Sequence, residues 1–157
     1  MNNYLNVLEA SLHKKLNVLD EIQAYNEKQY ESFSTEEVDM DSFDRAIEEK
    51  GRLIEELTKL DDGFETLYAN IAKQLEQNKE RYAPQIKTLQ ELIRQVTEKS
   101  VSVQASEARN KALIEKYFAK EKNQIKEGRV NSKVAYGYYQ NLNKAALEDS
   151  RGFDLKK

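Results

Sequence analysis

The chain of 157 residues is 34% charged, carries a formal net charge of −3 at pH 7, and contains five Gly and one Pro. So few Gly and Pro residues cannot supply the turns of a sandwich, a barrel or a doubly wound sheet, and Leu, Ile, Val and Phe, at about a quarter of the chain, allow only a thin core. With no Cys and a single His, His13, the sequence offers no disulfide, no thiol nucleophile and no multi-histidine metal site. The composition predicts an all-α protein, and we expect neither an enzyme nor a metal or other cofactor.

The sequence also bears on where the protein works. The first residues lack a basic leader followed by an apolar run, so we expect no secretory signal. No apolar stretch approaches the roughly 20 residues that a membrane helix needs. The slightly negative net charge disfavours nucleic acid as a partner. We therefore expect a cytoplasmic protein without membrane insertion.

The first predicted helix covers residues 3–31. Its apolar residues recur every three or four positions from Leu5 to Ile22, which keeps them on one face. The periodicity ends near residue 31, where Ser, Thr and acidic residues gather, so a loop is expected up to residue 39.

The second predicted helix covers residues 41–80, with Asp41 or Ser42 as its N-cap. The motif Asp61-Asp62-Gly63 interrupts the pattern, but the apolar residues keep their phase across it. Because Gly costs only about 1 kcal/mol inside a helix, we expect one continuous helix with a weak point here.

The third predicted helix covers residues 84–127, after a tight connection at residues 78–82. Pro84 suits its first turn, where a missing N–H costs nothing. From Leu89 to Tyr117 the core positions alternate steps of three and four, which is a heptad pattern. We expect an elongated antiparallel bundle of three to four long helices with coiled-coil-like packing, formed by residues 1–128.

Three polar residues, Ser100, Glu107 and Asn110, occupy core positions of that heptad pattern. Polar residues at such positions commonly fix the register or the choice of partner. Two other interpretations are open: a locally frayed or solvated stretch, and direct contact with a partner helix.

Residues 129–157 form a Tyr-rich tail that is expected to be a short helix or mobile. Its tyrosines could fold back on the bundle or line a groove for a partner's amphipathic helix. The end of the third helix would supply more apolar surface than a projecting helix can bury. The candidate partner-binding residues are Leu113, Ile114, Tyr117, Phe118, Ile125, Tyr136, Tyr138 and Tyr139.

The chain resembles the FlgN family of flagellar export chaperones, in its Gram-positive form. The resemblance lies in FDRAIEEKGRLIEELTKLDDGFETLY (residues 43–68), RYAPQIKTLQELIRQVTE (81–98) and QASEARNKALIEKYF (104–118), followed by an aromatic segment and DSRGFDLKK (149–157). Each piece is a helical pattern of low specificity, and their order and spacing carry the resemblance.

The resemblance implies a chaperone that binds the C-terminal amphipathic helix of hook-associated (hook-filament junction) proteins, prevents premature assembly and presents them to the flagellar export gate. The alternatives are a structural coiled-coil or adaptor protein that self-associates, and a chaperone for the filament cap protein. A homodimer is compatible with either class.

Overall fold

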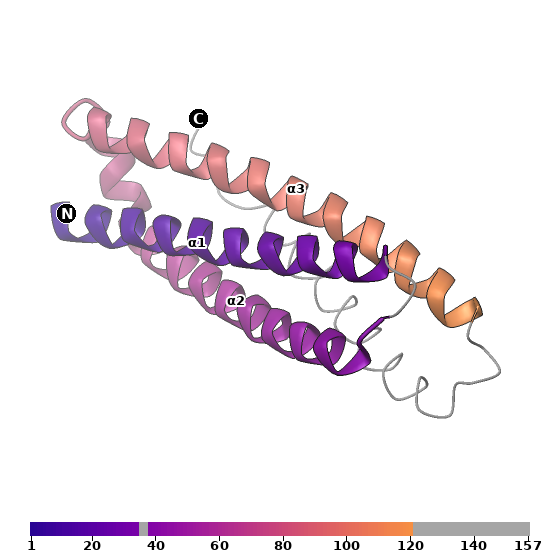
Figure 1. Ribbon diagram of the computed structural model, residues 1–157. Helices are drawn as coiled ribbons and strands as arrows, with labels where there is room; N and C mark the ends of the chain where they lie inside the picture. The colour runs from indigo at the N-terminus through magenta and orange to yellow at the C-terminus, as the bar shows by residue number, and fades with distance from the viewer. Residues whose placement is uncertain (35–37, 121–157) are drawn as a thin grey trace.

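Three long helices make up nearly all of residues 1–34 and 38–120, which are the residues that the computed structural model describes (Figure 1). The helices are α1 (Asn2–Phe33), α2 (Met40–Gln77) and α3 (Ala83–Lys120). Within these ranges the chain forms no strand, so the all-α prediction is confirmed. Successive helices run in opposite directions, with α1 and α3 pointing the same way (Figure 1).

The start of α2 differs from the prediction. The N-cap is Asp39, whose Oδ1 accepts hydrogen bonds from the backbone N–H groups of Asp41, at 3.1 Å, and Ser42, at 3.2 Å. The predicted caps, Asp41 and Ser42, therefore lie inside the first turn. The helix starts earlier because Asp39 caps it, and Met40 in its first turn packs against the core.

The other predicted boundaries hold to within a few residues. Helix α1 continues to Phe33, two residues beyond the prediction, and Phe33 packs on Phe43 of α2. Pro84 lies in the first turn of α3, as predicted, after the turn at residues 78–82. The predicted continuation of the third helix beyond Lys120 and the tail at 129–157 lie outside the described residues.

Helix α2 runs without a break through Asp61-Asp62-Gly63, which confirms the prediction of one continuous helix. Gly63 is exposed, and no glycine of the described ranges has a positive φ. Asp61 forms an ion pair with the buried Lys15 of α1. The acidic motif thus ties α2 to α1 rather than ending the helix.

Replacing Gly63 with Ala is expected to leave the stability unchanged or to raise it by up to about 1 kcal/mol, because Ala favours the helical backbone more than Gly does. A Cβ at this position would meet no atom within 4 Å. Urea denaturation of the variant measures the effect. Gly51→Ala, at a second helical glycine with the same open surroundings, is the control. A clear loss of stability in the Gly63 variant would contradict the continuous helix.

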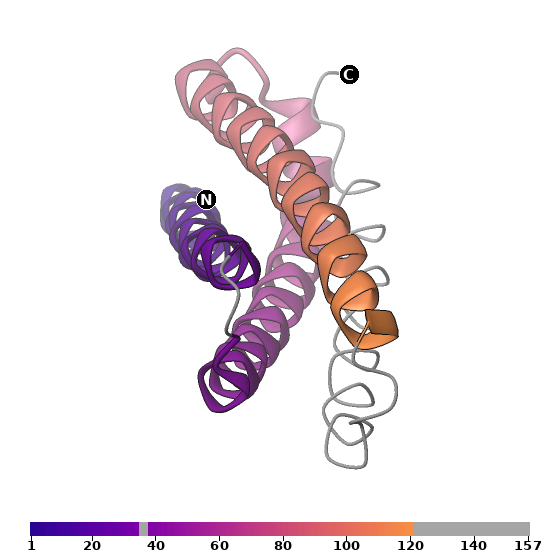
Figure 2. The same ribbon diagram turned by 45° about the vertical axis from the view of Figure 1, so that its right-hand side comes forward.

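Helix α1 is the element that holds the other two together. It packs against both α2 and α3, whereas no Cα atom of α2 lies within 8 Å of a Cα atom of α3. Figure 2 shows the two helices well separated at the ends remote from the turn, with α1 to one side of both. The packing is therefore two helix pairs that share α1.

The hydrophobic core follows the predicted face of α1 and the facing sides of α2 and α3. All six apolar positions of the α1 pattern are buried, and Leu8 and Ile22 are fully inaccessible. The buried apolar residues are Leu5, Leu8, Leu12, Leu16, Val18, Leu19, Ile22, Phe43, Ile47, Leu53, Ile54, Leu57, Phe64, Ile71, Leu75, Tyr82, Leu89, Leu92, Val96, Val103 and Ile114. None of the three helices is apolar enough along its length to cross a membrane.

Candidate binding site

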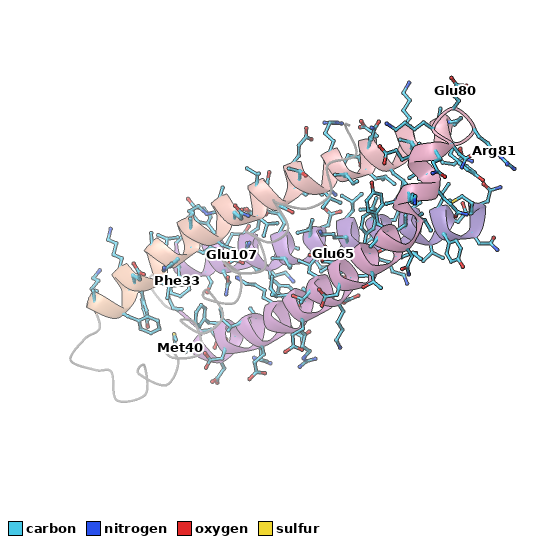
Figure 3. All side chains as sticks on the ribbon, turned by 180° about the vertical axis from the view of Figure 1, so that it is seen from behind. Phe33, Met40, Glu65, Glu80, Arg81 and Glu107 are labelled. Carbon is cyan, nitrogen blue, oxygen red and sulfur yellow. The ribbon has the colours of Figure 1, made fainter. Side chains whose placement is uncertain are left out.

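The end of α1, the start of α2 and the last described turn of α3 lie at the same end of the molecule (Figure 1), and we call this region the distal end. Figure 3 labels Phe33 and Met40 there, opposite the turn that contains Glu80 and Arg81. Phe33 at the end of α1 contacts both Phe43 of α2 and Tyr117 of α3, so side chains from all three helices come within reach of one another here. The candidate site is built at this end.

An aromatic cluster formed by Phe33, Phe43, Tyr117 and Phe118 lies at the distal end. Phe33 meets Phe43 edge to face, with 5.3 Å between ring centroids, and meets Tyr117 at 5.5 Å. Tyr117 in turn contacts Phe118 at 5.6 Å. Phe43 is buried, whereas the other three rings are half-buried. The cluster thus joins all three helices and retains accessible aromatic surface.

The structure describes four of the eight predicted partner-binding residues. Ile114 is a core residue with 3% of its surface exposed, so it offers no accessible surface, because it lies on the internal face of α3. Leu113, Tyr117 and Phe118 are half-buried, and Phe118 packs against the core. The remaining four, Ile125, Tyr136, Tyr138 and Tyr139, lie outside the described residues.

A buried polar layer lies next to the aromatic cluster. The three predicted polar core residues, Ser100, Glu107 and Asn110, are all buried within α3, so the stretch is neither frayed nor solvated. Glu107 forms an ion pair with Lys50 of α2, at 2.8 Å between Nζ and Oε1, and both side chains are almost fully inaccessible. Because the backbones of α2 and α3 do not approach each other, this pair bridges the space between them.

Helix α1 completes the polar layer. Lys50 Nζ also donates hydrogen bonds to Asn26 Oδ1 and to Gln29 Oε1, each at 2.7 Å. Asn110 Nδ2 donates to the backbone carbonyl oxygen of Asn26 at 2.9 Å. The layer therefore links all three helices at one level along the molecule, and its five members are Asn26, Gln29, Lys50, Glu107 and Asn110.

Sequence reasoning missed three members of the layer. Asn26 and Gln29 continue the spacing of the α1 pattern beyond Ile22, and Lys50 stands between two apolar core positions of α2. Polar residues that continue an apolar pattern were the available signal.

Burial lowers the pKa of Lys50 to about 8, although the carboxylate of Glu107 and its hydrogen bond oppose the shift. In the unfolded chain Lys50 keeps its ordinary pKa of 10.5. Between pH 8 and that value the unfolded state therefore binds more protons than the folded state. The unfolding free energy is therefore expected to rise with pH above 8, by at most about 2 kcal/mol at pH 9.5.

Urea denaturation at a series of pH values between 7 and 9.5 measures this rise. Lys50→Met should reduce this rise in stability. Part of the rise should remain in the variant, because burial lowers the pKa of Lys15 as well. A stability that falls over this range in the unsubstituted protein would contradict the assignment.

A cleft with a volume of about 240 Å³ opens between α1 and α2 beside the polar layer. Gln29 lines it from α1, and Phe43, which also belongs to the aromatic cluster, lines it from α2. The cleft and the aromatic cluster are thus continuous. The full lining is Tyr25, Lys28, Gln29, Ser32, Ser42, Phe43, Arg45, Ala46 and Glu49.

No protein-family model matches the chain, and no significant match to a curated protein or to a solved structure was found. A function for this chain must therefore be argued from its own residues and their arrangement.

Proposed function

We propose that this protein is a helix-binding chaperone of the flagellar export system, as the FlgN-like segments suggest. It binds the C-terminal amphipathic helix of a hook-associated protein in the cytoplasm, keeps that helix from assembling prematurely, and presents the complex to the export gate. The client helix packs in coiled-coil fashion as a fourth helix beside α2 and α3.

The observation that carries this proposal is the arrangement of the three helices. Helices α2 and α3 both pack on α1, and between α2 and α3 there is no close backbone approach, only side-chain contact such as the ion pair of Lys50 with Glu107. An additional amphipathic helix laid along α2 and α3 would give each of them a second apolar neighbour, which is the usual way in which helical grooves recognise helices.

The half-buried rings at the distal end support the same function. Tyr117 packs on Phe33 and Phe118 packs on Tyr117, so both rings are held in place and can bind a partner with little loss of side-chain freedom. Large aromatic side chains of this kind dominate binding energies in interfaces.

The test is binding of the full chain to synthetic C-terminal helices of hook-associated proteins and of filament cap proteins, measured by calorimetry and size-exclusion chromatography. Tyr117→Ala/Phe118→Ala should weaken binding of the client by about 2 kcal/mol or more, which is about thirtyfold in Kd. The control is Tyr4→Ala/Val7→Ala, which alters two exposed apolar residues near the start of α1.

The outcomes separate the candidate functions. A monomer or small dimer that gains helicity with a hook-associated helix supports the proposal. Preference for the cap-protein helix would reassign the client. A stable, elongated homo-oligomer that ignores all the peptides would overturn the chaperone function in favour of a structural coiled-coil protein.

A further inference from the structure

Gln29, which lines the cleft between α1 and α2, has a buried hydrogen-bond donor without an acceptor within the described ranges. Gln29 is 3% exposed, and its Oε1 accepts from Lys50 Nζ at 2.7 Å. An ammonium group can only donate, so this bond fixes the amide orientation and leaves Nε2 as a donor. Nε2 has no hydrogen-bond partner in the described structure. A buried donor of this kind costs about 1–3 kcal/mol until an acceptor reaches it.

Two cations at the same cleft are also without carboxylate partners. Lys28 Nζ lies 5.7 Å from the ring centroid of Tyr25, and Arg45 Nε donates to the backbone oxygen of Asp41 at 3.3 Å. Neither side chain forms an ion pair with any residue that the structure describes. The lining therefore contains one buried hydrogen-bond donor without an acceptor and two cations without an ion-pair partner among the described residues.

The acceptor side of the lining is already engaged. Glu49, its one carboxylate, pairs with Arg52 at 3.0 Å. A ligand that meets the unpaired donor of Gln29 must therefore bring its own acceptor oxygen, and the two cations of the lining, Lys28 and Arg45, favour a negatively charged acceptor.

The size of the cleft and its surroundings narrow the ligand further. A volume of about 240 Å³ is below that of pockets for drug-sized molecules, about 300–1,000 Å³, and suits a single side chain. Burial and the neighbouring charges of Asp41 and Glu48 raise the pKa of Asp44, on the same turns of α2. These neighbouring negative charges repel a doubly charged group such as phosphate more strongly than a singly charged carboxylate.

We propose that this cleft binds the carboxylate of a Glu side chain on the partner helix. The carboxylate accepts a hydrogen bond from Gln29 Nε2 and pairs with Lys28 and Arg45, while its stem packs on Tyr25 and Phe43. The inference rests on the proposed function and adds to it a sequence requirement: a client helix carries an acidic residue beside its apolar face.

The probe is N-acetyl-glutamate methylamide, titrated into the ¹⁵N-labelled full chain while the side-chain amide signals of Gln29 are followed by NMR. The matched probe is N-acetyl-glutamine methylamide, which has the same shape without the charge. The glutamate probe should shift the Gln29 signals in a saturable way, and the glutamine probe should bind at least tenfold more weakly. Equal binding of the two probes, or an unmoved Gln29 signal, would overturn the proposal.

Arg45→Gln and Lys28→Gln, at exposed positions, should each weaken binding of the glutamate probe by several-fold. The matched control is Lys59→Gln, which removes an exposed cation of the same helix that does not line the cleft. A loss of binding in the Lys59 variant as large as in the Arg45 variant would mean that general charge, rather than the cleft, attracts the probe.

The two proposals can fail separately. If client helices bind but the glutamate probe does not shift the Gln29 signals, the carboxylate site is refuted and the proposed chaperone function is not. A cleft that binds the probe in a protein that binds no client helix would refute the chaperone function alone.

Discussion

Lys50→Met is expected to lower the unfolding free energy at pH 7 by about 3–5 kcal/mol, because Met cannot donate a hydrogen bond to the buried carboxylate of Glu107, as a lysine amine does in either protonation state. Both side chains are almost fully inaccessible, so water cannot replace the lost donor. The substitution also removes the donor that Asn26 and Gln29 share. Urea denaturation at pH 7 measures the change.

The matched control for this prediction is Lys99→Met. Lys99 pairs with Asp20 at 2.6 Å, but both side chains are substantially exposed. The median contribution of such surface pairs is about 0–1 kcal/mol, so this variant should be nearly as stable as the original protein.

The double variant Lys50→Met/Glu107→Leu tests whether the charges act as a pair. It should cost less than the sum of the two single variants, by about 2 kcal/mol, because removing the second charge relieves the first loss. Additive costs, or equal losses in the Lys50 and Lys99 variants, would contradict a buried ion pair between α2 and α3.

Leu89→Ala is expected to cost about 2–5 kcal/mol of stability, because Leu89 is fully buried on the inner face of α3 and its truncation leaves a cavity. Tyr117→Ala/Phe118→Ala should cost far less, because both rings are half-buried at the end of the helix. Thermal unfolding followed by circular dichroism compares the two.

The opposite order of stabilities would be informative. If the Tyr117/Phe118 variant unfolds while Leu89→Ala is tolerated, the aromatic cluster is the core of the distal end. The client site would then have to lie elsewhere on the bundle.

The course of the helices could be predicted because it depends on local chemistry. The spacing from Leu5 to Ile22 determines which face of α1 is buried, whatever lies opposite it. The unbroken phase of the apolar residues likewise predicted that α2 continues through Gly63. Pro84 predicted the start of α3, because a residue without a backbone N–H is tolerated in the first turn of a helix.

The exact start of α2 was harder to predict. Asp39, Asp41 and Ser42 are all good capping residues. A local pattern does not choose among them; in the structure the Asp39 side chain accepts from the N–H groups of Asp41 and Ser42, and Met40 packs against the core.

The candidate site could be predicted only in part. Heptad spacing placed Glu107 at a core position, but periodicity identifies a face and not the residue opposite. Lys50 and Glu107 are 57 positions apart, and Lys50 and Asn26 are 24 apart. Their meeting depends on the relative axial positions of three helices. The unpaired donor at the cleft depends on tertiary packing in the same way, because the hydrogen bond from Lys50 decides which end of the Gln29 amide is left without a partner.

The sharing of α1 by two partners has a consequence for synthesis on the ribosome. The contacts of α1 with α3 join residues 79 to 84 positions apart, among them Asp20 with Lys99 and Asn26 with Asn110. The hairpin of α2 and α3, which is the more local unit, contributes no close backbone packing. Helix α1 therefore meets α2 first, and Lys120 of α3 is added about 2–9 s after Gln77 of α2 at synthesis rates of about 5–20 residues per second. During this interval the nascent chain exposes the apolar face of α1 that α3 later covers, and that is when it is most prone to aggregate.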